Sequence, residues 1–298
     1  MNSLTLKQAV SRLVAPVAVF GAVGIAVSLH AAPVYSDNVL ASNPVAYFRL
    51  NETSGSSAAN AVISSTTTGS YGIRGSGSYT LGSTNAIRPP TYGGLDAGNV
   101  AVSLAGDVGG ESRNAGYLAT SSVASVTDYT MEFWLNNTRG AQDTLITFVA
   151  GTTDGAKWES LGIMGSVIPA YQGRFCVGAN VGAGETTQYF SGSLATAGWH
   201  DVALVRSGDK LNLYVDGVKD ATTITLSTSF GAANSFVIGA RASDKNWGMI
   251  GLIDEAAIYT TALSDGVIAD HYASAIPEPA SLVLLALAGV VVLRRRRA

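Results

Sequence analysis

Cysteine, histidine and charged residues are scarce in this 298-residue chain. The single Cys176 excludes an internal disulfide framework, and its apolar neighbours predict a buried, unreactive thiol. The three histidines, His30, His200 and His271, predict no metal cluster, because His30 falls in a segment that we expect to be removed. No nucleophile-elbow motif and no Cys–His pairing signal is present. These absences argue against the common catalytic sites.

Basic residues are also few, and six of the 18 lie at the two ends of the chain: Lys7, Arg12 and the run Arg294, Arg295, Arg296 and Arg297. Only Glu278 of the 21 acidic residues lies in the tail. The body between the ends therefore has 12 basic and 20 acidic residues, a net charge of −8. An acidic body without a basic stripe argues against nucleic acid and anionic membrane surfaces as partners.

The N-terminus has the pattern of a secretory signal peptide. Lys7 and Arg12 precede an apolar run from Leu13 to Leu29, and small residues follow at Ala31 and Ala32. We predict a signal peptide over residues 1–32, with cleavage somewhere between Ala31 and Ser36.

The C-terminus has three parts: Pro277-Glu278-Pro279, the apolar run Ala280–Leu293, and the four arginines. The run has 14 residues, whereas a comfortable membrane span needs about 20. The arginines favour the cytoplasmic side. An ordinary tail anchor is one reading of residues 280–293, but the Pro-Glu-Pro just before the run favours a temporary membrane segment.

Between the ends, alternation of apolar and polar residues predicts an all-β domain. The alternation is clear in Tyr129–Asn136 and in Lys210–Val215, which the turn pair Asp216-Gly217 follows. Further strands are predicted at 45–50, 100–104, 145–150, 173–179, 186–190, 200–206, 236–240 and 251–259. A single short helix is predicted over Asp265–Tyr272, with Ser264 as its N-cap.

Residues 53–90 are mostly Ser, Thr, Gly and Ala, which favours either a solvated surface loop or a ligand-facing insertion. Tyr71, Ile73 and Tyr79 are expected to hold parts of it as short edge strands.

The C-terminal tail, residues 277–298, resembles the PEP-CTERM sorting signal of Gram-negative bacteria. The resemblance implies that an exosortase, a membrane enzyme, removes the tail after transient residence in the inner membrane. The protein would then pass to the cell surface or to an extracellular polysaccharide matrix.

Three segments together resemble the laminin-G-like, concanavalin A-like jelly-roll family. They are Asn43–Gly55, the hairpin from Trp199 to Gly217, and the closing segment from Phe236 to Ser264. The resemblance implies a two-sheet antiparallel β-sandwich over residues 37–275, in which the first and last strands lie side by side.

Some relatives hydrolyse β-glucans with a Glu-x-Asp-x-(x)-Glu cluster on one strand. Here Glu132 stands alone, and the adjacent Asp254 and Glu255 are expected to point to opposite faces of their strand. We therefore predict that the protein is not an enzyme. The alternative is a polysaccharide hydrolase or lyase with an unrecognised site.

Many relatives hold a structural calcium ion where the first turn meets the closing strand. By motif position the ligands would be Glu52 and Asp254, with Asn51 or Asn60 in support. The other reading is that Glu52 caps a turn and Asp254 bonds nearby backbone.

A glycan site needs an exposed aromatic ring beside polar groups. Trp158 and Trp247 lie in polar, glycine-rich contexts and are the predicted ligand-binding residues, although packing of a loop would explain them equally. Trp134 and Trp199 lie in strand patterns and are expected to pack inside. The sequence thus predicts a glycan- or matrix-binding module, with a purely structural matrix component as the other non-catalytic reading.

Overall fold

A computed structural model describes residues 35–276, apart from residues 89, 107–113, 115, 139–144, 152–156, 166–167, 181–184, 194–197, 227–232 and 242–244. The predicted signal peptide (1–32), the sorting segment (277–298) and its apolar run (280–293) lie outside the described residues. Within the described part, no helix has the length and apolar character needed to cross a membrane.

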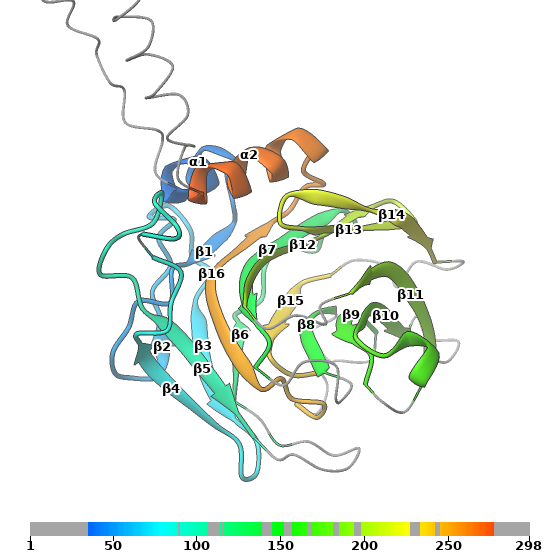
Figure 1. The fold of residues 1–298 in the computed structure, drawn as a ribbon, viewed down its shortest axis with the longest axis horizontal. Helices are drawn as coiled ribbons and strands as arrows, with labels where there is room; N and C mark the ends of the chain where they lie inside the picture. Colours follow the sequence, from blue (N-terminus) through cyan, green and yellow to red (C-terminus); the bar gives the residue numbers. More distant parts are fainter. Residues whose placement is uncertain are drawn as a thin grey trace, which may run out of the picture. The chain divides into compact units, whose positions relative to one another are not determined.

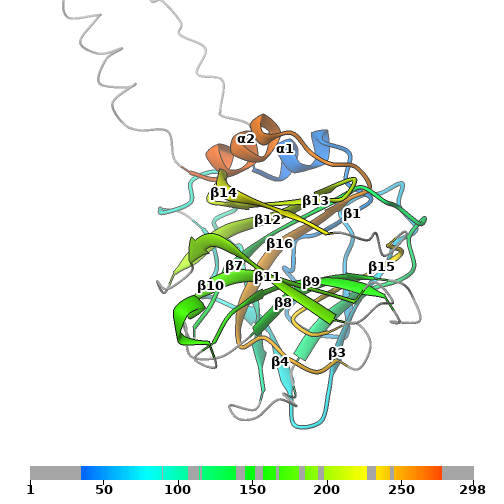
Figure 2. The same ribbon diagram turned by 90° about the vertical axis from the view of Figure 1, so that its right-hand side faces the viewer.

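The described residues form two antiparallel sheets of eight strands each. The two sheets pack as a sandwich (Figures 1 and 2). The first sheet has the order β14-β13-β12-β7-β16-β5-β4, with β1 also paired to β16. Its strands are β1 (Ala46–Phe48), β4 (Ser78–Ser83), β5 (Ala101–Ala105), β7 (Tyr129–Asn136), β12 (Trp199–Ser207), β13 (Lys210–Val215), β14 (Val218–Thr225) and β16 (Gly251–Tyr259).

The second sheet has the order β11-β10-β9-β8-β15-β6-β3-β2. Its strands are β2 (Ser57–Ala58), β3 (Gly69–Ile73), β6 (Gly116–Thr120), β8 (Leu145–Gly151), β9 (Trp158–Ile163), β10 (Arg174–Asn180), β11 (Glu185–Ser193) and β15 (Ser235–Ile238). The predicted two-sheet β-sandwich is therefore confirmed.

The predicted pairing of the first and last strands is also confirmed. β1 pairs with β16, and Ala46 lies opposite Ile258. The turn between β13 and β14 has positive φ at Asp216 (52°) and Gly217 (73°), as a two-residue type I′ hairpin requires. The predicted helix is α2 (Asp265–Ala275), and the Ser264 side chain accepts a hydrogen bond from the Val267 N–H.

The strands β6, β9 and β14 were not predicted from the sequence, and neither was a second helix. A second helix, α1 (Tyr35–Ala41), precedes β1 and lies beside α2 (Figure 1). Residues 53–90 contain the short strands expected around Tyr71 and Tyr79: β3 joins the second sheet, and β4 forms an edge of the first. Tyr71 of β3 is 6% exposed and stacks on Tyr79 of β4 at a centroid distance of 5.2 Å. These rings, together with the buried Ala58 and Ile87, anchor the segment in the packed layers.

Buried residues form two main layers. One lies between the sheets, and the other lies between the outer face of the first sheet and the helical cap, by which we mean α1 and α2. In the outer layer the ring of Trp134 from β7 contacts Tyr35 of α1 edge-on at 6.2 Å and stacks with Tyr272 of α2 at 5.9 Å. As predicted, Trp134 is a packing residue.

Gly94 joins the two ends of the domain. Its carbonyl accepts a hydrogen bond from the Tyr35 N–H (3.0 Å), and its own N–H donates to the Ala275 carbonyl (3.1 Å). A Cβ atom at Gly94 would overlap the carbonyl of Ser274, so this close approach requires glycine.

Candidate functional site

Trp158 does not offer the exposed ring that its sequence context predicts. It begins β9 and is 7% exposed. Its ring lies over Gly178 of the neighbouring strand β10, where an added Cβ atom would come within 3.3 Å of the ring. The prediction of a loop-surface ring is therefore wrong for Trp158, because sheet pairing draws the residue into a packed position.

We accordingly expect Trp158→Ala to destabilise the protein. Removing a buried tryptophan side chain costs about 3–5 kcal/mol, since it uncovers the packed surface around Gly178. Urea unfolding followed by circular dichroism would measure the loss. A decrease in the free energy of unfolding below about 1 kcal/mol would contradict the packing role and would support the original prediction of a surface ring at Trp158.

Trp247 fits its sequence context better. It is half-buried in the connection between β15 and β16, and its backbone has φ 57°. Lys245, two residues earlier, places its Nζ atom 5.5 Å from the centre of the Tyr117 ring. The binding role of Trp247 stays a prediction.

An exposed aromatic pair lies elsewhere. Tyr171 ends the short 3-10 helix η2 (Pro169–Tyr171), and its ring stacks on Tyr189 of β11 with centroids 3.9 Å apart and planes 2° from parallel. Tyr171 is 36% exposed and Tyr189 is partly exposed. The guanidinium of Arg174 lies 5.7 Å from the centre of the Tyr171 ring, within cation–π range. We call Tyr171, Tyr189 and Arg174 the tyrosine platform.

Sequence reasoning missed the tyrosine platform because its two rings come from separate segments. Pairing of β10 with β11 sets Cys176 opposite Tyr189 and thereby brings Tyr189 back toward η2. No short motif links the two tyrosines. An exposed aromatic pair is nevertheless the kind of surface on which a sugar ring stacks.

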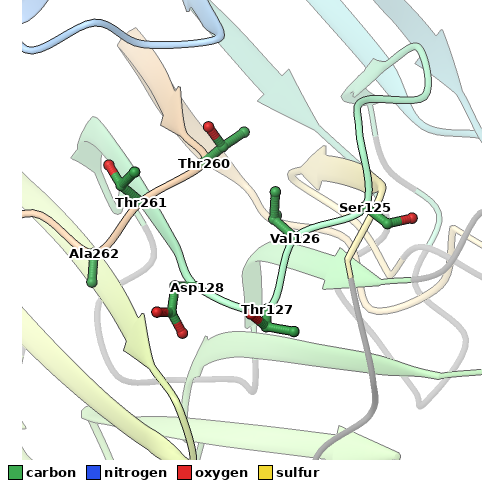
Figure 3. Close-up of a pocket in the computed structure, with 7 residues that line it drawn as sticks. All are labelled: Ser125, Val126, Thr127, Asp128, Thr260, Thr261 and Ala262. Atoms are coloured by element: carbon green, nitrogen blue, oxygen red, sulfur yellow. The ribbon is translucent and has the colours of Figure 1, made fainter.

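A shallow pocket of about 560 Å³ lies where the segment before β7 runs beside the segment after β16 (Figure 3). Four of its lining residues carry hydroxyl groups, and Asp128 adds a carboxylate that accepts a hydrogen bond from the Gly208 N–H at 2.8 Å. The lining residues are Ser125, Val126, Thr127, Asp128, Thr260, Thr261 and Ala262. This pocket offers hydrogen bonds to a polar ligand but no ring for stacking.

The two carboxylates predicted to hold calcium are already hydrogen-bonded. Glu52 accepts from the Ala59 N–H (2.7 Å) and from the Tyr71 hydroxyl (2.8 Å). Asp254 is fully buried and accepts from the Asn99 amide (2.7 Å) and from the Glu255 N–H (3.0 Å).

These contacts match the other reading of the sequence, in which Glu52 caps a turn and Asp254 bonds backbone. Across the described residues, no group of three or more His, Cys, Asp or Glu side chains is placed to hold a metal. Calcium at Glu52 and Asp254 stays a prediction.

Asp254 and Glu255 do not point to opposite faces. Pairing of β16 with β7 shifts register between Asp254 and Ala257, and Glu255 has φ 49°. This bulge leaves both carboxylates on the outer side of the sheet, between Ile253 and Ala256, which pack in the inter-sheet core.

Glu255 is engaged inside the outer layer. It accepts a hydrogen bond from the Tyr47 hydroxyl, and Arg49 forms an ion pair with it at 3.2 Å. Burial raises the pKa of the Glu255 carboxyl to about 7, although Arg49 and Tyr47 oppose the shift. The group is held internally, not presented in a cleft.

Glu132 is buried under the helical cap in a hydrogen-bonded chain that the sequence did not reveal. Its Oε2 atom lies 2.8 Å from Nδ1 of His271 in α2, and Nε2 of His271 lies 2.8 Å from the Ser42 hydroxyl oxygen. The hydrogen-bonded order Ser42, His271, Glu132 is that of a Ser–His–acid catalytic triad. However, the N–H groups of Ser42 and Asn43 already donate to the carbonyls of Val39 and Leu40, so neither is free to stabilise an oxyanion. We interpret these hydrogen bonds as structural contacts that hold α1, α2 and β7 together.

Two parts of the chain match known protein families. Residues 111–269 match the model of the concanavalin A-like lectin/glucanases superfamily, and residues 275–297 match the PEP-CTERM protein-sorting motif. A comparison with curated proteins found no match.

Solved structures share the fold at low identity. A botulinum neurotoxin type C structure matches with a TM-score of 0.51 and 14% identity, over 80% of this chain and 53% of that one. The binding domain of botulinum neurotoxin DC, in complex with rat synaptotagmin II, gives 0.50 and 13%, over 78% and 51%. Domain 4 of an extracellular arabinanase from Geobacillus stearothermophilus, in complex with arabinotriose, gives 0.48 and 20%, over 77% and 98%. The chain thus spans about half the length of the neurotoxin structures, and the likeness shows the fold alone.

The family match covers more than half of the chain, and it includes β7, β12, β13 and β16 at the centre of the first sheet. This protein belongs to the concanavalin A-like lectin/glucanase superfamily and carries a PEP-CTERM protein-sorting motif at its C-terminus.

Proposed function

We propose that this protein is an exported, non-catalytic glycan-binding module of the cell surface or extracellular matrix. Its C-terminal motif implies sorting by an exosortase-type enzyme, which supports an outside location. The observation that carries the binding role is the tyrosine platform, an exposed pair of stacked rings on a concanavalin A-like sandwich.

The chemistry of the platform suits a sugar. Pyranose rings have apolar faces that stack on aromatic rings, while the tyrosine hydroxyls and the Arg174 guanidinium offer hydrogen bonds at the edge. The acidic body, with its net charge of −8, disfavours acidic polymers and favours neutral or basic glycans. One stacking site gives modest affinity, on the order of micromolar to millimolar, so multivalent attachment would be needed for tight binding.

A hydrolase or lyase is the rival proposal, and it needs two carboxylates that face a substrate. The buried acids work against it. Glu132 is tied to His271, Glu255 to Tyr47 and Arg49, and Asp254 to Asn99. A structural matrix component without a ligand is the remaining candidate, and a glycan-array screen that finds no binding would favour it.

We predict that Tyr171→Ala and Tyr189→Ala each weaken glycan binding about fivefold to tenfold, because each removes about 1 kcal/mol of stacking. A glycan array would identify the ligand, and titration calorimetry would measure each variant. Cell entry of botulinum neurotoxin type C depends on interaction with two ganglioside molecules, which is a property of that protein. For this reason we include ganglioside glycans in the screen.

Tyr79→Ala is the matched control, because Tyr79 is a partly exposed ring that stacks on the buried Tyr71. It should leave glycan affinity unchanged. If the two platform variants keep full affinity while Trp247→Ala loses it, the site is at Trp247 instead.

A further inference from the structure

The outer face of the first sheet, beneath the helical cap, carries several buried polar atoms without a hydrogen-bond partner. They are Oη of Tyr35, Oε1 of Glu132, Nε1 of Trp134, Nε1 of Trp199 and both carboxylate oxygens of Asp201. Tyr35 is 0% exposed, and Glu132 and Asp201 are each 1% exposed. Buried polar groups in native proteins are nearly always paired, so such a cluster calls for an occupant.

Strand pairing brings the residues of β7 and β12 in this group onto one face of the sheet. Asp201 of β12 lies directly opposite Trp134 of β7, so their side chains share a face of the sheet. Glu132 lies two residues before Trp134 in β7, and Trp199 lies two residues before Asp201 in β12. Both side chains therefore lie on the same face as this pair. Tyr35 covers them from α1, with its ring 6.2 Å from that of Trp134. We call this set the buried polar patch.

The charges of the buried polar patch do not balance. Glu132 has His271 as a partner on Oε2, but neither oxygen of Asp201 accepts a hydrogen bond. Asp201 is 1% exposed, and Glu132, which is also 1% exposed, adds a second carboxylate on the same face of the sheet. A carboxylate in such surroundings must take up either a proton or a cation.

We infer that the buried polar patch binds one hydrated divalent cation, held by the Asp201 carboxylate, Oε1 of Glu132 and Oη of Tyr35. All these ligands are hard oxygen atoms, which Mg²⁺ and Ca²⁺ prefer. The patch offers only two carboxylates, so water completes the coordination shell, as is usual for Mg²⁺. Those waters also accept hydrogen bonds from the indole N–H groups of Trp134 and Trp199, which a bare cation cannot satisfy.

This site is separate from the one that the sequence predicts. Glu52 and Asp254 already use their oxygens in hydrogen bonds, whereas the Asp201 carboxylate, Oε1 of Glu132 and Oη of Tyr35 have no hydrogen-bond partner. The cation would join β7, β12 and α1, and would therefore stabilise the docking of the helical cap.

The test uses the whole folded protein with Ca²⁺ or Mg²⁺ alone as the probe. After equilibration with each ion and gel filtration, elemental mass spectrometry should find about one ion per chain with the preferred cation. Prolonged treatment with EDTA should remove the ion and lower Tm, because a ligand that binds only the folded state stabilises it. Asp201→Asn should abolish both the bound ion and the EDTA effect on Tm.

Two further variants keep the test decisive. Tyr35→Phe removes one oxygen with little change in shape, and it should weaken cation affinity roughly tenfold even if Asp201→Asn fails to fold. Glu52→Gln is the matched control and should retain the ion. If wild-type protein holds no ion and EDTA leaves Tm unchanged, Asp201 is neutralised by a proton and the proposal is wrong. It is equally wrong if the ion survives Asp201→Asn or Tyr35→Phe unchanged but is lost in Glu52→Gln.

Discussion

Replacing Arg206 with methionine is expected to lower the free energy of unfolding by about 3–5 kcal/mol. Arg206 of β12 is 0% exposed and forms an ion pair with Glu159 of β9, which is also 0% exposed, so the pair joins the two sheets across the core. The Tyr129 hydroxyl also donates a hydrogen bond to Glu159 at 2.8 Å. Without the guanidinium, Glu159 remains as a buried charge without a cation, and this uncompensated charge is the main cost.

Guanidinium chloride unfolding would measure this loss, and two variants serve as controls. Lys219→Met breaks the ion pair with Asp265, whose side chain is 66% exposed, and should cost less than about 1 kcal/mol. The double variant Arg206→Met/Glu159→Met removes both charges and should recover most of the stability, because an apolar pair can replace a buried ion pair. A small effect of Arg206→Met alone, or no recovery in the double variant, would count against this account.

Raising the pH from about 4.5 to 7 is expected to destabilise the protein. Burial raises the pKa of Glu255 from 4.5 to about 7 in the folded state, against the opposing effects of Arg49 and Tyr47. Between these two values the folded protein holds a proton that the unfolded chain has lost, so stability falls as the pH rises. The stabilisation is complete below about pH 4.5 and is lost as the pH passes 7.

The shift corresponds to roughly 3 kcal/mol for Glu255 alone. Two neighbouring groups act in the same direction. Burial and the charge of Glu255 raise the pKa of Asp254. Burial lowers the pKa of His271, but the hydrogen bond and charge of Glu132 outweigh it and raise the net value. All three groups therefore favour the folded state more strongly in acid.

Thermal unfolding in EDTA-containing buffers across this pH range would check the prediction. Glu255→Gln should flatten the dependence of Tm on pH, because it removes a carboxyl whose pKa is raised from 4.5 to about 7 in the folded state. Asp37→Asn, a substitution at an exposed carboxyl in α1, is the control and should keep the wild-type slope. A protein that becomes more stable between pH 4.5 and 7 would overturn the assignment of Glu255 as a protonated internal acid.

The sequence by itself determined several local elements and the family of this protein. Alternation over Tyr129–Asn136 specifies a strand because successive side chains point to opposite faces. Asp216-Gly217 specifies a hairpin because both residues tolerate positive φ. Ser264 marks the start of α2 because its hydroxyl can cap the first turn. The C-terminal motif could also be recognised from the sequence, because its proline, apolar and arginine blocks act through local chemistry.

Only the tertiary structure decided which residues could form a site. Alternation assigns a side chain to a face but does not name the strand beside it, and so it could not show that Trp158 packs over Gly178. The bulge at Asp254–Glu255 breaks the period of two that the sequence prediction assumed.

The tyrosine platform and the buried polar patch each join segments far apart in the chain. Tyr171 meets Tyr189 through the pairing of β10 with β11, and Asp201 meets Trp134 through that of β12 with β7. Such contacts depend on the register between distant strands, which the whole sandwich fixes by burying its core. No local pattern carries that information.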